Sequence, residues 1–456
     1  MKYFVLLAVA FHNFALNNAQ GVGTTTPETQ PKFVYHSCTG KDSCKPVDGT
    51  VTVDSNWRWA HDASGKNCYT GNTWDTTICP DGATCAKNCV LDGADYKSTY
   101  GVTSDKDGAS LTLKFVTNGP YSKNYGSRLY ALASDGNYQM FMLKNKRFSF
   151  TVDVSQLPCG LNGALYFSQM NADGDKSATN LAGAKYGTGY CDAQCPTDIK
   201  WIKGKANSEG WKPAENDPGK NTGNGNLGNC CPEVDIWEAN SISQAFTPHP
   251  CKSAKPTVCE KEACGHFEGT RYKSICDKDG CDFASYRWGA KDFYGKGKKV
   301  DTSLPITVHT DFVTKDGTDN GKLVEIRRSY VQNGKTIANE PVKFQGLFKP
   351  ADSITQEFCD ATKKFTGDVN DFKAKGGMEG VDAAMTAGMV LVFSIWDDQE
   401  AQMAWLDGTY PPNKSGAGVE RGTCKAGEGK PETVRQEHPN ASVTFSDVRI
   451  GAITDK

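Results

Sequence analysis

The sequence has no marked excess of charge of either sign, and no long hydrophobic run beyond its first residues. Its 51 basic and 53 acidic residues leave a formal net charge of -2. That near balance removes any overall electrostatic attraction to nucleic acid or to an anionic membrane. No later segment approaches the roughly 20 apolar residues that a membrane-spanning helix needs. We therefore expect a neutral partner, no nucleic acid and no membrane.

The one apolar run lies at the N-terminus and is too short to span a bilayer. Lys2 forms a short basic region, residues 3–11 are apolar, and Ala19 is a small residue before a cleavage point. This order is typical of a secretory signal over residues 1–19, with Gln20 starting the mature chain. The sequence thus predicts a secreted, extracellular protein.

The chain also lacks internal repeats and a linker between domains. The only linker-like stretch, residues 21–31, directly follows the signal and is interpreted as a tail. β-Sandwich enzymes with long loops can exceed the average domain size. Residues 20–456 are therefore expected to form a single domain.

Helix signals are few and strand signals are many. Helices are expected at residues 380–388 and around 354–363. Segments rich in β-branched and aromatic residues, separated by Gly, Asp and Asn turns, predict antiparallel sheets. They are residues 109–117, 147–155, 324–332, 388–396 and 441–450. We expect an all-β fold of two stacked, curved sheets, in which the long polar loop 203–229 is ordered.

The 18 cysteines all lie beyond the signal, and an even number suits an oxidising compartment. They allow up to nine disulfides. Four sulfurs could instead hold zinc, and the candidates are Cys191, Cys195, Cys230 and Cys231. Secretion favours oxidation, so we expect disulfides and no metal.

Residues 230–240, CCPEVDIWEAN, crowd three carboxylates behind two adjacent cysteines. In a regular strand Glu233 and Asp235 share one face, while Glu238 points to the other. A β-bulge between Asp235 and Glu238 would bring all three onto one surface, and bulges are common beside active sites. Adjacent cysteines do not readily bond to each other, so each is expected to tie this strand to a remote partner.

A solvated sheet face is the alternative interpretation of these acids, but the cysteine anchors favour a functional one. Like charges held close together raise the proton affinity of a carboxyl. Retaining glycoside hydrolysis requires two carboxyls with separated proton affinities, about 5 to 5.5 Å apart. One attacks the sugar, and the other protonates the departing oxygen.

The segment EVDIWEANSIS, followed by TPHPC, resembles the catalytic strand of glycoside hydrolase family 7, the cellobiohydrolases and endoglucanases. Other segments are similar in the same order along nearly the whole mature chain. They are NWRWAHD, GNTWDTTICPDGATCAKNC, KSTYGVT, QLPCGLNGALYF, AGAKYGTGYCDAQCP, SIWDD, MAWLDGTYP and ERGTC. The resemblance implies a concanavalin-like jelly roll whose long, disulfide-tied loops roof a substrate tunnel.

By this resemblance Glu233 is the nucleophile, and Glu238 is the general acid that later activates water. Asp235 orients and tunes Glu233. His249 matches a histidine on the leaving-group side, although by itself it would be taken for a packing or surface residue. The mechanism needs no cofactor.

Glucose rings stack their flat C–H faces on aromatic side chains, and their hydroxyls bind polar groups. The resemblance assigns Trp57 and Trp59 to sugar platforms toward the entrance, and Trp396 and Trp405 to platforms near the cleavage point. A sheet-core role is the alternative for each tryptophan, and a surface salt bridge is the alternative for each charged residue. The residues matching the cleft floor are Tyr166, Tyr190, Asp192 and Gln194, and those matching the product side are Arg271, Asp279, Asp282, Tyr410 and Arg421.

The family's disulfide pattern uses every cysteine of this chain once. It pairs Cys38 with Cys44, Cys68 with Cys89, Cys79 with Cys85, Cys159 with Cys424, Cys191 with Cys231, Cys195 with Cys230, Cys251 with Cys276, Cys259 with Cys264, and Cys281 with Cys359. A tenth bridge of many relatives is missing, because Val90 replaces one partner and residues 20–37 contain no cysteine. The N-terminal segment is therefore expected to be looser than in those relatives.

Loop length separates the family's two activities, since long loops form the tunnel of cellobiohydrolases and short loops leave endoglucanases open. Stretches 203–229, 251–276 and 397–423 look near cellobiohydrolase length. The resemblance thus implies a cellobiohydrolase that threads a β-1,4-glucan chain and releases cellobiose from its reducing end, and we expect a monomer. The alternatives are an endoglucanase of the same family and a non-catalytic, lectin-like sandwich that binds glucan.

Two sequons and the C-terminus complete the expectations. Asn413 in NKS and Asn440 in NAS are candidate glycosylation sites at the surface. The sequence ends without a Pro/Ser/Thr-rich linker or a cellulose-binding module. Adsorption to cellulose is therefore expected to depend on the catalytic domain.

Overall fold

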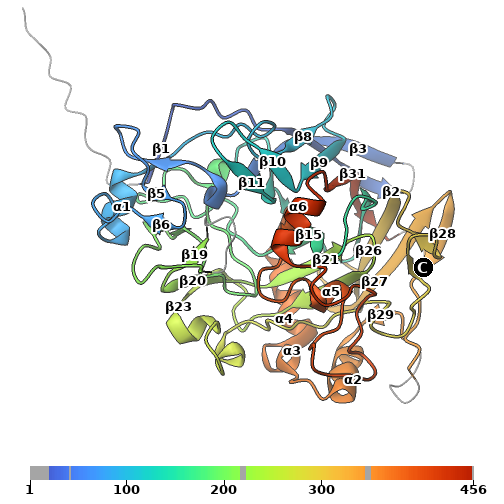
Figure 1. The fold of residues 1–456 in the computed structure, drawn as a ribbon. Helices are drawn as coiled ribbons and strands as arrows, with labels where there is room; N and C mark the ends of the chain where they lie inside the picture. Colours follow the sequence, from blue (N-terminus) through green and yellow to red (C-terminus); the bar gives the residue numbers. More distant parts are fainter. Residues whose placement is uncertain (1–19, 41–42, 216–221, 345–350, 454–456) are drawn as a thin grey trace, which may run out of the picture.

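A computed structural model describes residues 20–40, 43–215, 222–344 and 351–453. The expected signal lies outside these residues, as does part of the loop 203–229. Strands dominate the described residues, and the helices are short (Figure 1). Within these ranges, no helix is both long and apolar enough to cross a membrane. The prediction of an all-β fold is confirmed.

One path of hydrogen-bonded strands runs through the described residues. Its order is β22 (Gln244–His249), β21 (Glu233–Ala239), β15 (Leu161–Ser168), β30 (Met389–Asp397), β12 (Ser127–Leu132), β3 (Ser43–Val53), β2 (Lys32–Gly40), β31 (Ser442–Ala452), β14 (Lys146–Asp153), β26 (Ile306–Thr314), β27 (Leu323–Gln332) and β28 (Lys335–Ala338). Neighbours along the path are antiparallel, except β2 and β31, which are parallel. The strands predicted from the sequence all lie in this path or branch from it, apart from the end of segment 109–117.

The path folds back on itself into two layers. Phe148 of β14 contacts Phe167 of β15, and Phe150 of β14 contacts Trp237 of β21, with ring centroids 5.0 and 6.1 Å apart. These rings belong to one large apolar core, so β14 packs face to face against β15 and β21. The predicted sandwich is confirmed, and it places β21 over the core with its second face free for chemistry.

Smaller strands branch from this sandwich or form short sheets beside it. The branches are β8 (Val102–Ser104), β9 (Ser110–Lys114), β13 (Met140–Phe141) and β29 (Ser353–Ile354). The short sheets contain β1 (Gly21–Val22), β4 (Ala60–His61) and β7 (Val90–Leu91); β5 (Tyr69–Thr70) and β6 (Thr73–Trp74); β10 (Val116–Asn118) and β11 (Lys123–Tyr125); β16 (Trp201–Ile202) and β17 (Lys205–Ala206); β18 (Lys212–Pro213) and β19 (Gly223–Asn224); β20 (Leu227–Cys230) and β23 (Thr257–Glu260); and β24 (Tyr294–Gly295) and β25 (Val300–Asp301).

The helices are short and are spread around the sandwich (Figure 1). They are α1 (Gly82–Asn88), α2 (Gln356–Thr366), α3 (Asp371–Ala374), α4 (Gly377–Thr386), α5 (Ala404–Asp407) and α6 (Pro431–Glu437), with 3-10 turns at η1 (Ser55–Trp57), η2 (Ala184–Tyr186), η3 (Lys261–Cys264) and η4 (Arg271–Lys273). Helices α2 and α4 confirm the two predictions. Helix α1 was not predicted, although Asp81 caps it by accepting bonds from the amides of Ala83 and Thr84.

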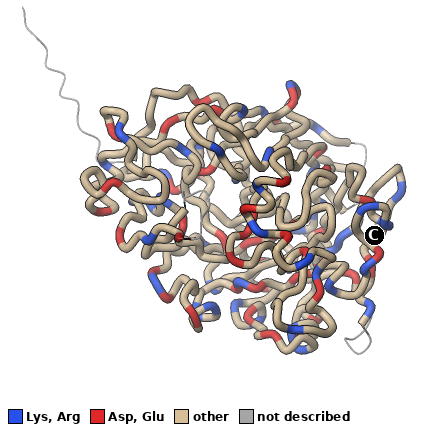
Figure 2. The backbone as a smooth tube through the Cα atoms, in the orientation of Figure 1, with Lys and Arg blue, Asp and Glu red and all other residues tan. Residues whose placement is uncertain are grey.

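The nine disulfides join the pairs that the resemblance implies, and no cysteine is free. The alternative of a zinc site at Cys191, Cys195, Cys230 and Cys231 is wrong, because these four form two bridges. Lysine, arginine and the acidic residues are intermingled along the whole backbone (Figure 2). That arrangement matches the balanced composition.

The N-terminal segment is held by hydrogen bonds rather than by a disulfide. Gly21 of β1 is the register partner of Val90 in β7, the position at which the expected tenth bridge is missing. Gln20 is fully buried, and its backbone bonds to Thr179 and Leu181. That this segment is looser than in relatives with the tenth disulfide stays a prediction.

Candidate active site

Strand β21 contains the β-bulge that the sequence predicts. On the β22 side, three residue steps from Asp235 to Glu238 oppose two steps from Thr247 to Ala245. The strand therefore has one extra residue before Glu238. Its apolar residues turn to the core on both sides of the bulge, and they are Val234, Ile236, Trp237 and Ala239. Glu233, Asp235 and Glu238 consequently share the opposite face.

Two disulfides anchor the beginning of this strand. Cys230 bonds to Cys195, and Cys231 bonds to Cys191, so the segment 191–195 lies against the acids. The backbone N–H of Ala193, within that segment, donates a 3.0 Å hydrogen bond to Glu233. The prediction that each adjacent cysteine ties the strand to a remote partner is confirmed.

His249 of β22 lies beside Asp235. Its Nε2 is 3.1 Å from an Asp235 carboxylate oxygen, and its Nδ1 is 2.8 Å from the backbone carbonyl of Asp277. A carbonyl can only accept, so Nδ1 carries a hydrogen. The contact between Nε2 and Asp235 must then hold a further proton, carried by one partner or the other.

Burial keeps this acidic cluster partly protonated. It raises the pKa of both Glu233 and Asp235 well above the ordinary range, and the neighbouring carboxylates raise both further. Burial also raises the pKa of Glu238 to about 7, although His249 and the amide of Asn162 oppose that rise. Asn162 donates a 3.0 Å hydrogen bond to Glu238. All three carboxyls of this face therefore bind protons more tightly than they would in water.

A chain of phenols and carboxylates continues from the acids along the sheet. The hydroxyls of Tyr166 and Tyr190 lie 2.8 Å apart, and Tyr190 donates a 2.6 Å hydrogen bond to Asp192. Asp192 also accepts from the backbone N–H of Gln194 at 2.8 Å, and the Gln194 side chain donates to the carbonyl of Lys278. These four residues form one hydrogen-bonded group.

The match to a family model extends from residue 22 to residue 456, and that model describes glycosyl hydrolase family 7. The chain belongs to glycoside hydrolase family 7. A solved cellobiohydrolase of this family from Daphnia pulex is 50% identical, with a TM-score of 0.93 over 96% of this chain and 100% of that one. A Melanocarpus albomyces cellobiohydrolase, solved with cellotetraose, is 42% identical, with a TM-score of 0.90 over 96% and 99% of the chains.

Endoglucanases of the family are similar but less so. The Humicola insolens endocellulase is 37% identical, with a TM-score of 0.79 over 95% of this chain and 99% of that one. The family 7 neighbours share the jelly-roll sandwich, so the expected fold class is confirmed. The family establishes a glycosidase of cellulose-degrading type.

The residues matched to the product side of the family 7 fold form ion pairs. Arg271 contacts Asp279 at 2.6 Å, and both remain partly exposed. Asp282 is held by Arg287 and lies 3.7 Å from Arg421. Asp282 also helps to raise the pKa of Glu238. Tyr410 lies at the surface, where it is 38% exposed.

The four tryptophans lie in an order set by the sheet. Trp396 is the last residue but one of β30 and stacks on Trp405 of α5, with ring centroids 6.1 Å apart. Trp57 follows β3, and Trp59 stands at the surface, stacked on His61. Because β3, β12, β30, β15 and β21 are successive neighbours, β3 and the strand of the acids are separated by four strand spacings, or roughly 19 Å.

Sequence reasoning missed two residues of this face. Asn162 binds Glu238 through its amide and accepts the N–H of Ala239 through its oxygen. Arg128 of β12 stacks on the ring of Tyr190 at 3.5 Å and pairs with Asp54. Both are polar residues inside otherwise buried strands. For Asn162, this polar residue within the apolar segment QLPCGLNGALYF was the signal that the sequence offered.

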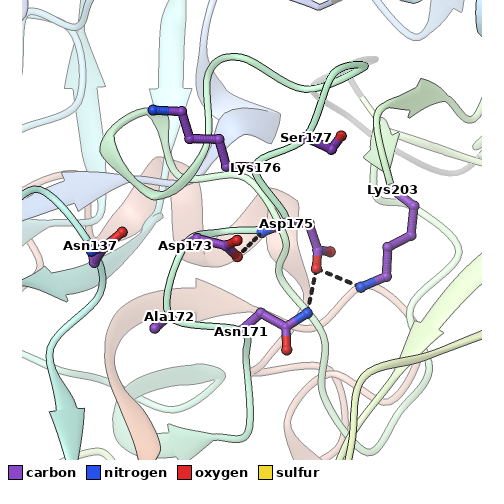
Figure 3. Close-up of a pocket in the computed structure, with 8 residues that line it drawn as sticks. All are labelled: Asn137, Asn171, Ala172, Asp173, Asp175, Lys176, Ser177 and Lys203. Carbon is purple, nitrogen blue, oxygen red and sulfur yellow. Dashed lines mark hydrogen bonds and ion pairs between the residues drawn. The ribbon is translucent and has the colours of Figure 1, made fainter.

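A separate hollow of about 670 Å³ lies away from these residues (Figure 3). Asn171, Asp175 and Lys203 line it, and Asp175 accepts hydrogen bonds from the other two at 2.6 and 2.5 Å. None of its lining residues is aromatic. The hollow therefore offers an internal ion pair and no platform for a sugar ring.

Proposed function

We propose that this chain is a secreted cellobiohydrolase that hydrolyses β-1,4-glucan with retention and releases cellobiose from the reducing end. The observation that carries this proposal is the bulge in β21, which brings Glu233 and Glu238 to one face with a pKa of about 7 for Glu238. Two carboxyls with different protonation are what double displacement uses.

In the first step the carboxylate of Glu233 attacks the anomeric carbon, while Glu238 gives its proton to the glycosidic oxygen. The cellobiosyl group is then bound covalently to Glu233. In the second step Glu238, now ionised, takes a proton from water, which attacks the same carbon and releases Glu233. Protons balance over the cycle, because Glu238 regains from water what it gave to the leaving group.

Asp235 and His249 serve Glu233 rather than the sugar in this mechanism. The raised pKa of both buried acids means that Glu233 and Asp235 retain a proton between them. A proton held on Asp235 leaves Glu233 ionised, and the Ala193 N–H favours that ionised form. His249 fixes the orientation of Asp235 at 3.1 Å.

The product specificity rests on the comparisons and on loop length. Similarity is greater to the cellobiohydrolases than to the Humicola insolens endocellulase, by both identity and TM-score. We propose a glucan chain that passes over Trp59 and Trp57 at the entrance and over Trp396 and Trp405 near cleavage, under the described parts of the loop 203–229 and under the loops 251–276 and 397–423. Secretion by residues 1–19 and glycosylation of exposed Asn413 and Asn440 belong to the same proposal.

The test measures products from microcrystalline cellulose and from soluble carboxymethyl cellulose, with wild type and Glu233→Gln. We expect cellobiose as the main soluble sugar from wild type, little fall in viscosity, and no release by the variant. A rapid fall in viscosity would establish the endoglucanase instead. Binding without release by wild type would leave the lectin-like alternative.

A further inference from the structure

Arg328 is a buried cation for which the proposed reaction has no use. It lies in β27, where the alternate residues Ile326, Arg328 and Tyr330 turn inward, and its two flanking partners belong to the apolar core. Arg328 is only 4% exposed, its guanidinium has no carboxylate partner among the described residues, and the buried hydroxyl of Tyr330 is a hydrogen-bonding neighbour. A guanidinium buried with so few partners is costly, so it needs a compensating role.

The Arg328 side chain reaches across the core to the sheet that carries the acids. Its guanidinium carbon lies 4.3 Å from the ring centroid of Phe246 in β22 and 5.9 Å from that of Trp237 in β21. Aromatic faces attract a cation and partly replace its hydration. Its Nη2 donates a hydrogen bond to the backbone carbonyl of Ile236. Figure 1 shows β27 and β21 in the same central region of the sandwich.

Ile236 is the one residue that lies inside the irregular stretch on both edges of β21. Asp235 and Glu238 bracket it in the pairing with β22, and Val234 and Trp237 bracket it in the pairing with β15. The extra residue of a bulge is left out of the ladder of backbone hydrogen bonds. Its carbonyl is buried and needs a donor from elsewhere, and Arg328 supplies one.

We propose that Arg328 is a positioning residue that holds the bulge at Ile236 and so keeps Glu238 on the same face as Glu233. This inference rests on the proposed roles of the two acids. Without the guanidinium, the Ile236 carbonyl is buried and unpaired, and β21 lowers that cost by relaxing toward regular alternation. Regular alternation turns Glu238 away from the sugar, whereas Glu233 lies before the bulge and stays in place.

The test compares Arg328→Met, which keeps bulk without a donor, with Arg328→Lys, which keeps a donor. Arg147→Met is the matched control. Arg147 lies in β14 and pairs with Asp311 of the neighbouring β26, in the layer that does not carry the acids. Each variant is assayed on cellotetraose and on 2,4-dinitrophenyl cellobioside, whose leaving group needs no proton. We expect Arg328→Met to lose roughly tenfold more kcat on cellotetraose than on the aryl glycoside. Arg328→Lys should recover most of that difference, and Arg147→Met should show none.

Equal losses of Arg328→Met on both substrates would overturn the inference, as would Arg328→Lys behaving like Arg328→Met. Glu238→Gln is assayed alongside and should show the same selectivity. Selectivity in Glu238→Gln but not in Arg328→Met would refute the role of Arg328 alone, and its absence from Glu238→Gln would refute the acid assignment and this inference together. Should Arg328→Met not fold, Arg328→Gln, whose amide still donates, must show a smaller selectivity of the same sign.

Discussion

A carboxyl that donates a proton at neutral pH has to be kept protonated there by its surroundings, and burial does this for Glu238 by raising its pKa to about 7. Glu238→Gln removes the proton while keeping the shape of the side chain. We expect a loss in kcat of roughly a hundredfold or more on cellotetraose and a far smaller loss on 2,4-dinitrophenyl cellobioside. Steady-state kinetics on the two substrates checks this. Uniform losses would argue against the acid role.

Asn162 allows a second, independent test of the Glu238 pKa. Its amide donates to Glu238 and so favours the ionised form, which lowers the Glu238 pKa. In Asn162→Ala that stabilisation is gone, and Glu238 should stay protonated to higher pH. The basic limb of the kcat/KM profile for cellotetraose should therefore move to higher pH, while that for 2,4-dinitrophenyl cellobioside should not. A shift to lower pH would contradict this reasoning.

Single residues were predictable where a local rule applied to them. The spacing of Glu233, Asp235 and Glu238 required a bulge for all three to act together, and the structure has it. Arg328 and Asn162 were not predicted, because their significance comes from partners 92 and 76 positions away in the sequence. Alternation marks a polar residue as facing inward, but it does not say which group it will meet.

At the scale of elements, the disulfides decide how firmly β21 is anchored. The Cys195–Cys230 bridge spans 35 residues, whereas Cys38–Cys44 spans 6 within the β2–β3 hairpin. Loop-closure entropy gives about 4 kcal/mol for the first and about 2 kcal/mol for the second. We expect Cys195→Ala/Cys230→Ala to lower thermal stability more, and to lower kcat as well, because residues 191–195 hold Glu233.

Cys38→Ala/Cys44→Ala is the control for that prediction, since its bridge lies far along the sheet path from the acids. It should lower the melting temperature slightly and leave kcat unchanged. The comparison needs calorimetry and kinetics on the same preparations. A similar kcat in both double variants would mean that hydrogen bonds alone hold the 191–195 segment.

Strands and helices with a strong hydrophobic pattern were predicted from the sequence, and the shortest helices were not. Strands such as β14 and β30 have runs of β-branched and aromatic residues, and both were expected within two residues of their observed ends. The helices α1 and α6, of seven residues each, were missed. Seven residues give barely two turns, so capping by Asp81 and an initial Pro431 rather than an apolar stripe specify them.

At the scale of the whole molecule, the order of strands sets the order of the proposed sugar platforms. Trp59 is partly exposed and lies beyond β3, whereas Trp405 stacks on Trp396 beside the acids. Trp405→Ala should lower kcat/KM on cellotetraose by about tenfold or more, through lost stacking. Trp59→Ala should leave cellotetraose hydrolysis unchanged and slow only the attack on cellulose. An equal effect of Trp59→Ala on both substrates would contradict the proposed entrance.

Several buried carboxyls give the whole molecule a common response to pH. Burial raises the pKa of Glu238 from 4.5 to about 7 and that of Asp407 from 3.8 to about 7. A carboxyl whose pKa is higher in the folded state binds its proton more tightly there. Its contribution to stability is complete below the unfolded value and is lost as pH rises through the folded one.

We therefore expect the wild type to lose stability between about pH 4 and pH 8. The raised pKa of Asp407 corresponds to a loss of roughly 4 kcal/mol in the free energy of unfolding across this range. The raised pKa of Glu238 corresponds to less than about 3 kcal/mol, since this carboxyl keeps some contact with water. Glu238→Gln and Asp407→Asn should each flatten the dependence of melting temperature on pH. The melting temperature of each variant should exceed that of the wild type most at pH 8. Asp48→Asn is the control, because the Asp48 side chain is 79% exposed. Its melting temperature should depend on pH in the same way as that of the wild type. A difference from wild type that is the same at every pH would show that these carboxyls ionise in the folded protein at ordinary values.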